Sequence, residues 1–336
     1  MMNSSSEIFK TPYEPLRGLF LFYTEIQGDD FMPATHFICP NGERVPIAQC
    51  LHKCPHGQRC MFLPTLRAIS QSLERNIKEP TVTEFIAGVR ETYLKRTTNY
   101  AVDPLGIMYA LKGQAIHSIH EGFTEGAILS EIRLKDAITS GKFDLYGRIL
   151  NEDSDCVLGD LKVTSSYKLM KALGIYKVDV PTGESYKSGM RAGQPKFRKE
   201  FRYDGVRDVL DWTIQLNYYR MLLEDAGFRV DKMVIQAICR DSNLKTAAER
   251  GIDRTVYLIP INRISDHWLK SYFSKKAVLL NMALFNHELP PVCKPRESWN
   301  DRKCTGYCAA RENCPYAKRL IYEKESGEDY AIDIAS

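Results

Sequence analysis

The stretch from 128 to 163 decides the fold, because it holds three short runs in succession: ILSEIRLK (128–135), KFDLYGRIL (142–150) and DCVLGDLKV (155–163). Each run either alternates apolar and polar residues or is continuously apolar, and each is too short for a typical helix. The pattern therefore predicts three neighbouring strands.

Helical patterns and further extended runs surround these strands. Capping residues, apolar periodicity and terminal glycines predict helices at 64–76, Thr83–Lys95, Asp103–Gly122, Asp204–Gly227 and Ser265–Phe285. Two more strands are predicted at 230–239 and 254–261, whereas residues 1–38 are predicted to be irregular. This order predicts an α/β domain with a central mixed sheet flanked by helices.

Composition places few limits on function but some on location. The chain has 336 residues, 44% of them hydrophobic and 26% charged, as in an ordinary soluble protein. Its apolar runs are too short to cross a membrane, and residues 1–10 lack the basic start and apolar stretch of a signal peptide. We therefore expect a cytoplasmic protein without a membrane partner. In that reducing compartment, ten cysteines indicate metal ligation or buried thiols rather than disulfides.

The segment from Lys168 to Arg207 is strongly basic, with ten Lys/Arg against four Asp/Glu. Five aromatic residues are interleaved with these charges: Tyr176, Tyr186, Phe197, Phe201 and Tyr203. The prolines and glycines between Lys168 and Asp204 predict a long surface loop. A basic segment with aromatics suits a nucleic-acid backbone and stacked bases, but a solvated basic loop explains the composition equally well.

Four pieces of sequence carry residues suited to phosphodiester hydrolysis. His117 lies in a predicted helix, Asp144 in one strand, and Asp160 and Lys162 on the same side of the next strand. Gln215 and Tyr219 share one face of a later helix. Two carboxylates on adjacent strands can hold Mg²⁺, an imidazole makes Mn²⁺ acceptable, and a lysine stabilises developing charge. Each piece alone also has a purely structural explanation.

Together these pieces resemble the RecB-type branch of the PD-(D/E)XK nucleases, which includes helicase-linked exonucleases and the CRISPR-associated adaptation nuclease. The resemblance rests on GQAIHSIHE (113–121), FDLYGRI (143–149), GDLKVTSS (159–166) and QLNYY (215–219), in this order. It implies a restriction-endonuclease-like core in which His117, Asp144 and Asp160 bind metal, Lys162 assists the chemistry, and Gln215 and Tyr219 form the QxxxY motif. Two departures are that no proline precedes Asp144 and that Asp160 replaces the commoner glutamate.

Eight of the cysteines form two sets with identical spacing. Cys39, Cys50, Cys54 and Cys60 are separated by ten, three and five residues, and so are Cys293, Cys304, Cys308 and Cys314. The repeated gaps predict two equivalent Cys₄ sites, each holding either Zn²⁺ or a [4Fe–4S] cluster. CTGYCAARENCPY (304–316) is similar to the cluster-binding end of RecB-type nucleases, which favours iron and sulfur at the second site. There the fourth ligand is either Cys293 or an N-terminal cysteine.

The sequence thus predicts an N-terminal Cys₄ segment (1–62), a nuclease core (63–290) and a C-terminal Cys₄ segment (291–336). The function expected is divalent-metal-dependent DNA cleavage, with exonuclease action favoured, in repair, recombination or phage and defence processing. Single strands or duplex ends are the expected substrates. No nucleotide-binding GxxxxGK[ST] loop is present, so any helicase would be on another chain. The alternatives are an inactive nucleic-acid-binding protein with this fold and a zinc-stabilised scaffold.

Overall fold

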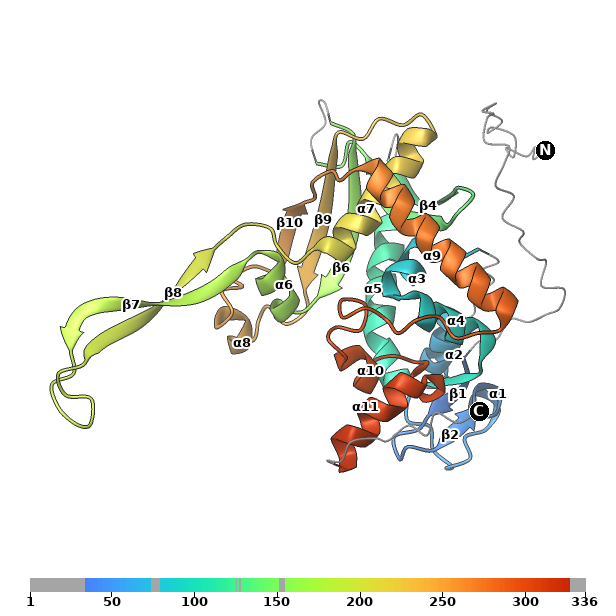
Figure 1. Cartoon of the computed structure of the whole chain (residues 1–336), viewed down its shortest axis with the longest axis horizontal. Helices are drawn as coiled ribbons and strands as arrows, with labels where there is room; N and C mark the ends of the chain where they lie inside the picture. Colours follow the sequence, from blue (N-terminus) through green and yellow to red (C-terminus); the bar gives the residue numbers. More distant parts are fainter. Residues whose placement is uncertain (1–33, 74–78, 125, 127, 151–154, 327–336) are drawn as a thin grey trace. The chain divides into compact units, whose positions relative to one another are not determined.

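The computed structural model describes residues 34–73, 79–124, 126, 128–150 and 155–326. In this part of the chain the main sheet has five strands, in the order β10-β9-β6-β5-β4. Their bounds are β4 Leu129–Lys135, β5 Ser140–Gly147, β6 Val157–Thr164, β9 Lys232–Cys239 and β10 Val256–Pro260. β6 and β9 are parallel and the other neighbours antiparallel, so the predicted mixed sheet is confirmed (Figure 1).

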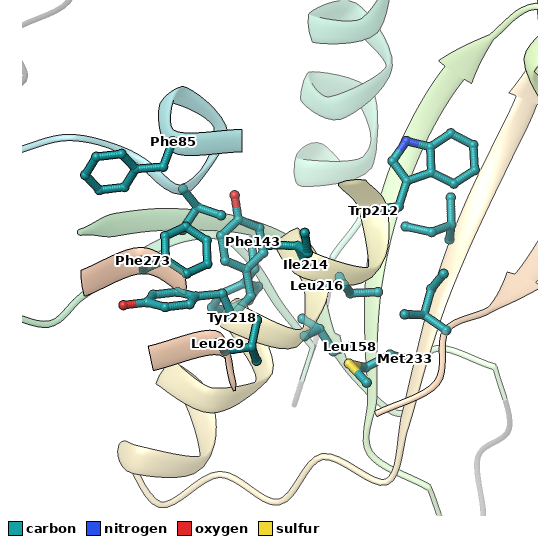
Figure 2. Packing of buried hydrophobic residues seen from close by; sticks show 14 of the residues in the cluster. Phe85, Phe143, Leu158, Trp212, Ile214, Leu216, Tyr218, Met233, Leu269 and Phe273 are labelled. Carbon is teal, nitrogen blue, oxygen red and sulfur yellow. The ribbon is translucent and has the colours of Figure 1, made fainter. Parts of the chain in front are cut away.

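Two long helices supply much of the core of this sheet. α7 (Leu210–Asp225) packs against β4, β5, β6 and β9, and α9 (Asp266–Asn286) packs against α7. Aromatic rings join these layers: the centroids of Tyr218 and Phe273 lie 4.1 Å apart, and Phe143 from β5 is in the same cluster (Figure 2). Such interlocked rings stabilise the sheet beyond their burial alone.

The helices before the sheet differ in detail from the prediction. The predicted helix starting at Thr83 is two helices, α3 (Val82–Ala87) and α4 (Val89–Thr97). Thr81 rather than Thr83 caps α3, in a capping box with Glu84, and Gly88 breaks the helix at φ +124°. α5 (Pro104–Gly122) agrees with the prediction, including its cap at Asp103.

A second, smaller sheet precedes α5 and has the order β2-β1-β3 in the described residues. Its strands are β1 Ala34–Ile38, β2 Arg44–Pro46 and β3 Tyr100–Val102, and α1 (Ile47–His52) and α2 (Leu63–Leu73) accompany it. Phe37, Leu66 and Ile69 form part of its own buried cluster. The prediction of irregular structure is therefore wrong for 34–38, and residues 1–33 lie outside the described part.

The predicted long loop at 168–204 is wrong. The segment contains α6 (Ser166–Ala172) and an antiparallel ribbon of β7 (Ile175–Ser185) and β8 (Pro195–Tyr203) that projects from the rest of the fold (Figure 1). Proline and glycine are compatible with it because the register shifts between Pro181 and Ser185, and a two-stranded ribbon consists only of edges. The predicted helix start at Asp204 is also too early, since α7 begins at Leu210.

The chain continues through α8 (Lys245–Ala248), near the base of this ribbon. After α9 it forms α10 (Arg302–Gly306), a short 3₁₀ turn (Arg311–Asn313) and α11 (Pro315–Ser326). No helix in the described part combines the length and apolar character that a membrane crossing requires.

Candidate metal centre at the point where the strands separate

The candidate site lies where β5 and β6 separate. Their pairing runs from Gly147↔Val157 to Leu145↔Gly159, and the next residues are the two predicted aspartates, Asp144 and Asp160. Asp144 Oδ2 accepts a hydrogen bond of 2.6 Å from the backbone N–H of Leu161. The Asp144 side chain thus accepts a backbone hydrogen bond at a position where the two strands no longer pair. Both aspartates are buried: Asp144 is 7% exposed and Asp160 is 1% exposed.

On the neighbouring strand, Glu131 faces the same opening. The β4–β5 register pairs Ser130 with Leu145 and Ile132 with Phe143 but skips Glu131 and Asp144 between them. Glu131 has φ +54°, in the left-handed region, where a residue with a side chain costs about 1–2 kcal/mol. Strain of this kind is typical of positions where the surroundings force a side chain into a functional orientation.

His117 from α5 completes the cluster. Its Nδ1 lies 2.9 Å from Glu131 Oε1 and 3.5 Å from Asp144 Oδ1, and Lys142 forms an ion pair with the other Glu131 oxygen. One possible ligand atom each from His117, Glu131 and Asp144 all lie within 4.8 Å of one another. The site therefore offers one imidazole and two carboxylates to a single point.

Asp160 stands beside this trio and is held by other residues. Lys162 Nζ lies 2.9 Å from its Oδ1 and 2.6 Å from its Oδ2, and Gln215 Nε2 donates to Oδ1 at 3.3 Å. Gln215 Nε2 is also 3.2 Å from the Tyr219 hydroxyl. The Tyr219 ring covers Gly141 in β5, where a Cβ would lie 2.2 Å from a ring carbon. The QxxxY residues are thus fixed between α7 and the sheet.

The electrostatics of the site call for additional positive charge. Burial, followed by repulsion from Asp160, raises the pKa of Asp144 from 3.8 to about 7. Burial also acts to raise the pKa of Glu131, but hydrogen bonds from Lys142 and His117 lower it overall. For Lys162, burial acts to lower the pKa, yet the carboxylates of Asp160 and Asp144 outweigh it and raise the pKa. Lys162 is therefore a permanent cation at neutral pH.

These residues fit a hard divalent cation. Among the described residues, no donor forms a hydrogen bond of proper geometry with the buried Asp160 Oδ2, although Lys162 Nζ lies 2.6 Å from it. A hydrogen bond needs alignment as well as proximity, so this contact leaves Oδ2 with room for a cation. Carboxylate oxygens suit Mg²⁺, and the imidazole of His117 makes Mn²⁺ equally suitable.

The structure brings together all six residues predicted from the sequence and adds Glu131. Within the described residues, the trio of mutually close ligand atoms contains Glu131 where the prediction had Asp160, which instead binds Lys162 and Gln215. The sequence signal for Glu131 was an acid within ILSEIRLK, in the strand preceding that of Asp144. It was missed because an acid on an alternating strand usually faces solvent.

The four N-terminal cysteines gather around one cavity of about 410 Å³, which His56 and Arg59 also line. The pKa of Cys39 and that of Cys50 are both raised, first by burial and then by the neighbouring thiols of the same set. His56 lies 3.2 Å from Glu43, so its imidazole already has a partner. These four cysteines therefore line one cavity, and a Cys₄ metal site there stays a prediction.

The C-terminal cysteines pack against the main core instead. Burial and the neighbouring thiols of Cys293 and Cys314 raise the pKa of Cys304 to about 11, whereas burial and Glu91 raise that of Cys308 to about 12. Cys293 also lies against α4, where a Cβ on Gly88 would be 2.9 Å from its Sγ. Of the two fourth ligands left open by the sequence, Cys293 is the one adjacent to Cys304.

Comparisons with known proteins add little to this geometry. No family model matches the chain, and no curated protein does. A solved structure titled "Crystal structure of SSO0001" aligns over 75% of this chain and 94% of its own, with 14% identity and a TM-score of 0.41.

Proposed function

We propose that this protein is a divalent-metal-dependent nuclease that hydrolyses phosphodiester bonds in DNA. One observation carries the proposal: the ligand atoms of His117, Glu131 and Asp144 converge within 4.8 Å, next to a buried aspartate paired with a charged lysine. Three strands are locally deformed or separated to make this cluster. Such a concentration of buried carboxylates is costly unless a cation neutralises it.

His117, Glu131 and Asp144 would hold the cation, with Asp160 next to it. A hard cation bound there supplies an activated water and neutralises charge on the phosphate. Lys162 stays protonated, so it stabilises negative charge rather than removing a proton. Gln215 and Tyr219 act as positioning residues, because Gln215 donates to Asp160 and contacts the tyrosine hydroxyl.

The test is a cleavage assay on end-labelled single-stranded, duplex and circular DNA with Mg²⁺, Mn²⁺ or EDTA. We expect metal-dependent cleavage that Asp160→Asn and Lys162→Met each reduce by at least about 10³-fold. Asp155→Asn is the matched control, since Asp155 pairs with Lys232 just before the same strand, away from the site. Unchanged cleavage in both site variants would contradict the assignment. DNA binding without cleavage under any metal would favour the inactive binding protein.

For the cysteine sets we infer structural metal sites that tie the two peripheral segments to the fold. The two candidates remain Zn²⁺ and a [4Fe–4S] cluster. Protein purified without oxygen should show either a broad absorbance near 400 nm with iron and sulfide, or no colour with zinc. Cys50→Ser and Cys304→Ser, measured separately, assign the metal content to each set. Wild-type protein with neither metal would show that the cysteines are simple buried thiols.

A further inference from the structure

The β7–β8 ribbon accounts for the whole net positive charge of the protein. Residues 175–203 contain seven Lys/Arg and three Asp/Glu, a net charge of +4, which equals that of the entire chain. The remaining residues have 39 of each sign. The excess charge is therefore concentrated in 29 residues rather than spread over the surface.

Four of the seven ribbon cations form no ion pair with any acidic residue that the structure describes. In the described part of the chain, Lys196, Arg198 and Arg202 form ion pairs with Glu184 or Glu200. No ion pair there involves the other four, although two of them lie over aromatic rings; these four are Lys177, Lys187, Arg191 and Lys199. The ribbon thus presents cations that internal contacts leave available.

Both faces of the ribbon are open to solvent. β7 and β8 pair only with each other in the described residues, and an isolated two-stranded hairpin is marginally stable in water. Large side chains nevertheless remain exposed along it: Tyr176 at 45%, Phe197 at 52% and Tyr203 at 64%. Exposed aromatics among unpaired cations are typical of a surface that contacts nucleic acid.

Local contacts with the rest of the fold fix the base of the ribbon. Backbone hydrogen bonds join Asp204 N–H to the Gly174 carbonyl and Arg207 N–H to the Ala172 carbonyl. Gly251 (φ +76°) packs so closely that a Cβ would lie 2.9 Å from Ile175 and 3.0 Å from Phe201. In the order of the chain, the ribbon lies between β6, which carries Asp160 and Lys162, and α7, which carries Gln215 and Tyr219. The base of the ribbon is therefore held by residues at both of its ends and by Gly251.

We propose that the ribbon is an arm that binds duplex DNA beside the strand to be cut. This rests on the proposed nuclease function and specifies its substrate as DNA with a double-stranded segment. The eleven residues of β7 extend over about 35 Å, close to one turn of duplex DNA. A two-stranded ribbon fits the major groove, and the four unpaired cations supply contacts to phosphates.

The test replaces the four unpaired cations with glutamine: Lys177→Gln, Lys187→Gln, Arg191→Gln and Lys199→Gln together. Four exposed lysines away from the ribbon (Lys53, Lys270, Lys275 and Lys318) are replaced in the control, which changes net charge equally. Fluorescence anisotropy, with Ca²⁺ in place of Mg²⁺, measures binding to a labelled duplex of about two turns and to a short single strand. Thermal unfolding confirms that both variants fold.

We expect the ribbon variant to lose at least about tenfold in duplex affinity and its logarithmic salt slope to fall by about 3–4, because each phosphate contact contributes about 0.9. Its cleavage of a short single strand should stay within about twofold of wild type, since no site residue has changed. Unchanged duplex affinity and salt slope, or equal losses for the lysine control, would overturn the proposal. Equal losses on duplex and single strand would also overturn it, and would indicate a single-strand arm. Ribbon-dependent duplex binding in a protein that cleaves nothing would support the arm and reject the nuclease.

Discussion

The candidate site and the ribbon come from one continuous stretch of chain but differ in how strongly the fold constrains them. At the site, Asp144 and Asp160 are buried and bound to a backbone N–H, a lysine and a glutamine. On the ribbon, four cations form no ion pair with the acidic residues that the structure describes, and large aromatics face solvent. Residues that perform chemistry on one bond need fixed positions, whereas residues that bind a long polymer need only availability. Substitutions should therefore alter chemistry and stability together at the site, but affinity alone on the ribbon.

The strongest test of this contrast is Glu131→Gln. The change keeps the size of the side chain but removes a carboxylate from the trio, so we expect cleavage to fall by about 10³-fold at saturating DNA. DNA binding should change little, because the ribbon is untouched. Steady-state cleavage and anisotropy on the same substrate measure the two effects.

Glu121→Gln is the matched control for that experiment. Glu121 lies four residues after His117 on α5 and is exposed, so its loss should leave cleavage within about twofold. Full activity in Glu131→Gln would show that the strained glutamate is not part of the cation site. Equal losses in the two variants would indicate a general electrostatic effect.

Most of the architecture followed from the sequence because period-2 and period-3.6 patterns report burial directly. The strands around Asp144 and Asp160 and the capped helix of His117 were predictable for this reason. The ribbon was not, because neither of its faces is buried and no apolar alternation marks it. Glu131 was missed for a different reason: its side chain enters the site through a positive φ, which a regular strand pattern does not reveal.

A smaller effect is expected in the stability of metal-free protein. The folded pKa of Asp144, about 7, lies above its ordinary value of 3.8, so between these values the native state binds more protons than the unfolded state. Stability contributed by this group is therefore present below about pH 4 and lost as the pH rises through about 7. The upper limit is about 4 kcal/mol, at 1.36 kcal/mol per unit, and we expect roughly half of it.

Asp144→Asn should remove this pH dependence, since asparagine can still accept the hydrogen bond from Leu161 without ionising. Thermal unfolding in EDTA from about pH 4.5 to 8 measures the slope. Adding Mn²⁺ should stabilise wild type more than the variant, because the cation favours the ionised carboxylate. An identical slope of stability against pH in both proteins would show that a group other than Asp144 causes the pH dependence.

The smallest expected effect is a difference in unfolding free energy between alanine substitutions at two glycines, one from each region. Alanine at Gly141 would place its Cβ 2.2 Å from the Tyr219 ring, which is held between α7 and the sheet, so the ring must move. We expect a loss of about 2 kcal/mol in unfolding free energy and a measurable fall in cleavage, because Tyr219 also positions Gln215.

Alanine at Gly183 in the ribbon meets no atom within 4 Å and carries only the strain of φ +77°, about 1 kcal/mol. Since a ribbon outside the core can fray locally, that smaller cost should leave the main unfolding transition and cleavage of short single strands unchanged. Chemical denaturation of both variants measures the difference. Equal global destabilisation would show that the ribbon is part of the cooperative core, and the contrast between the two regions would then fail.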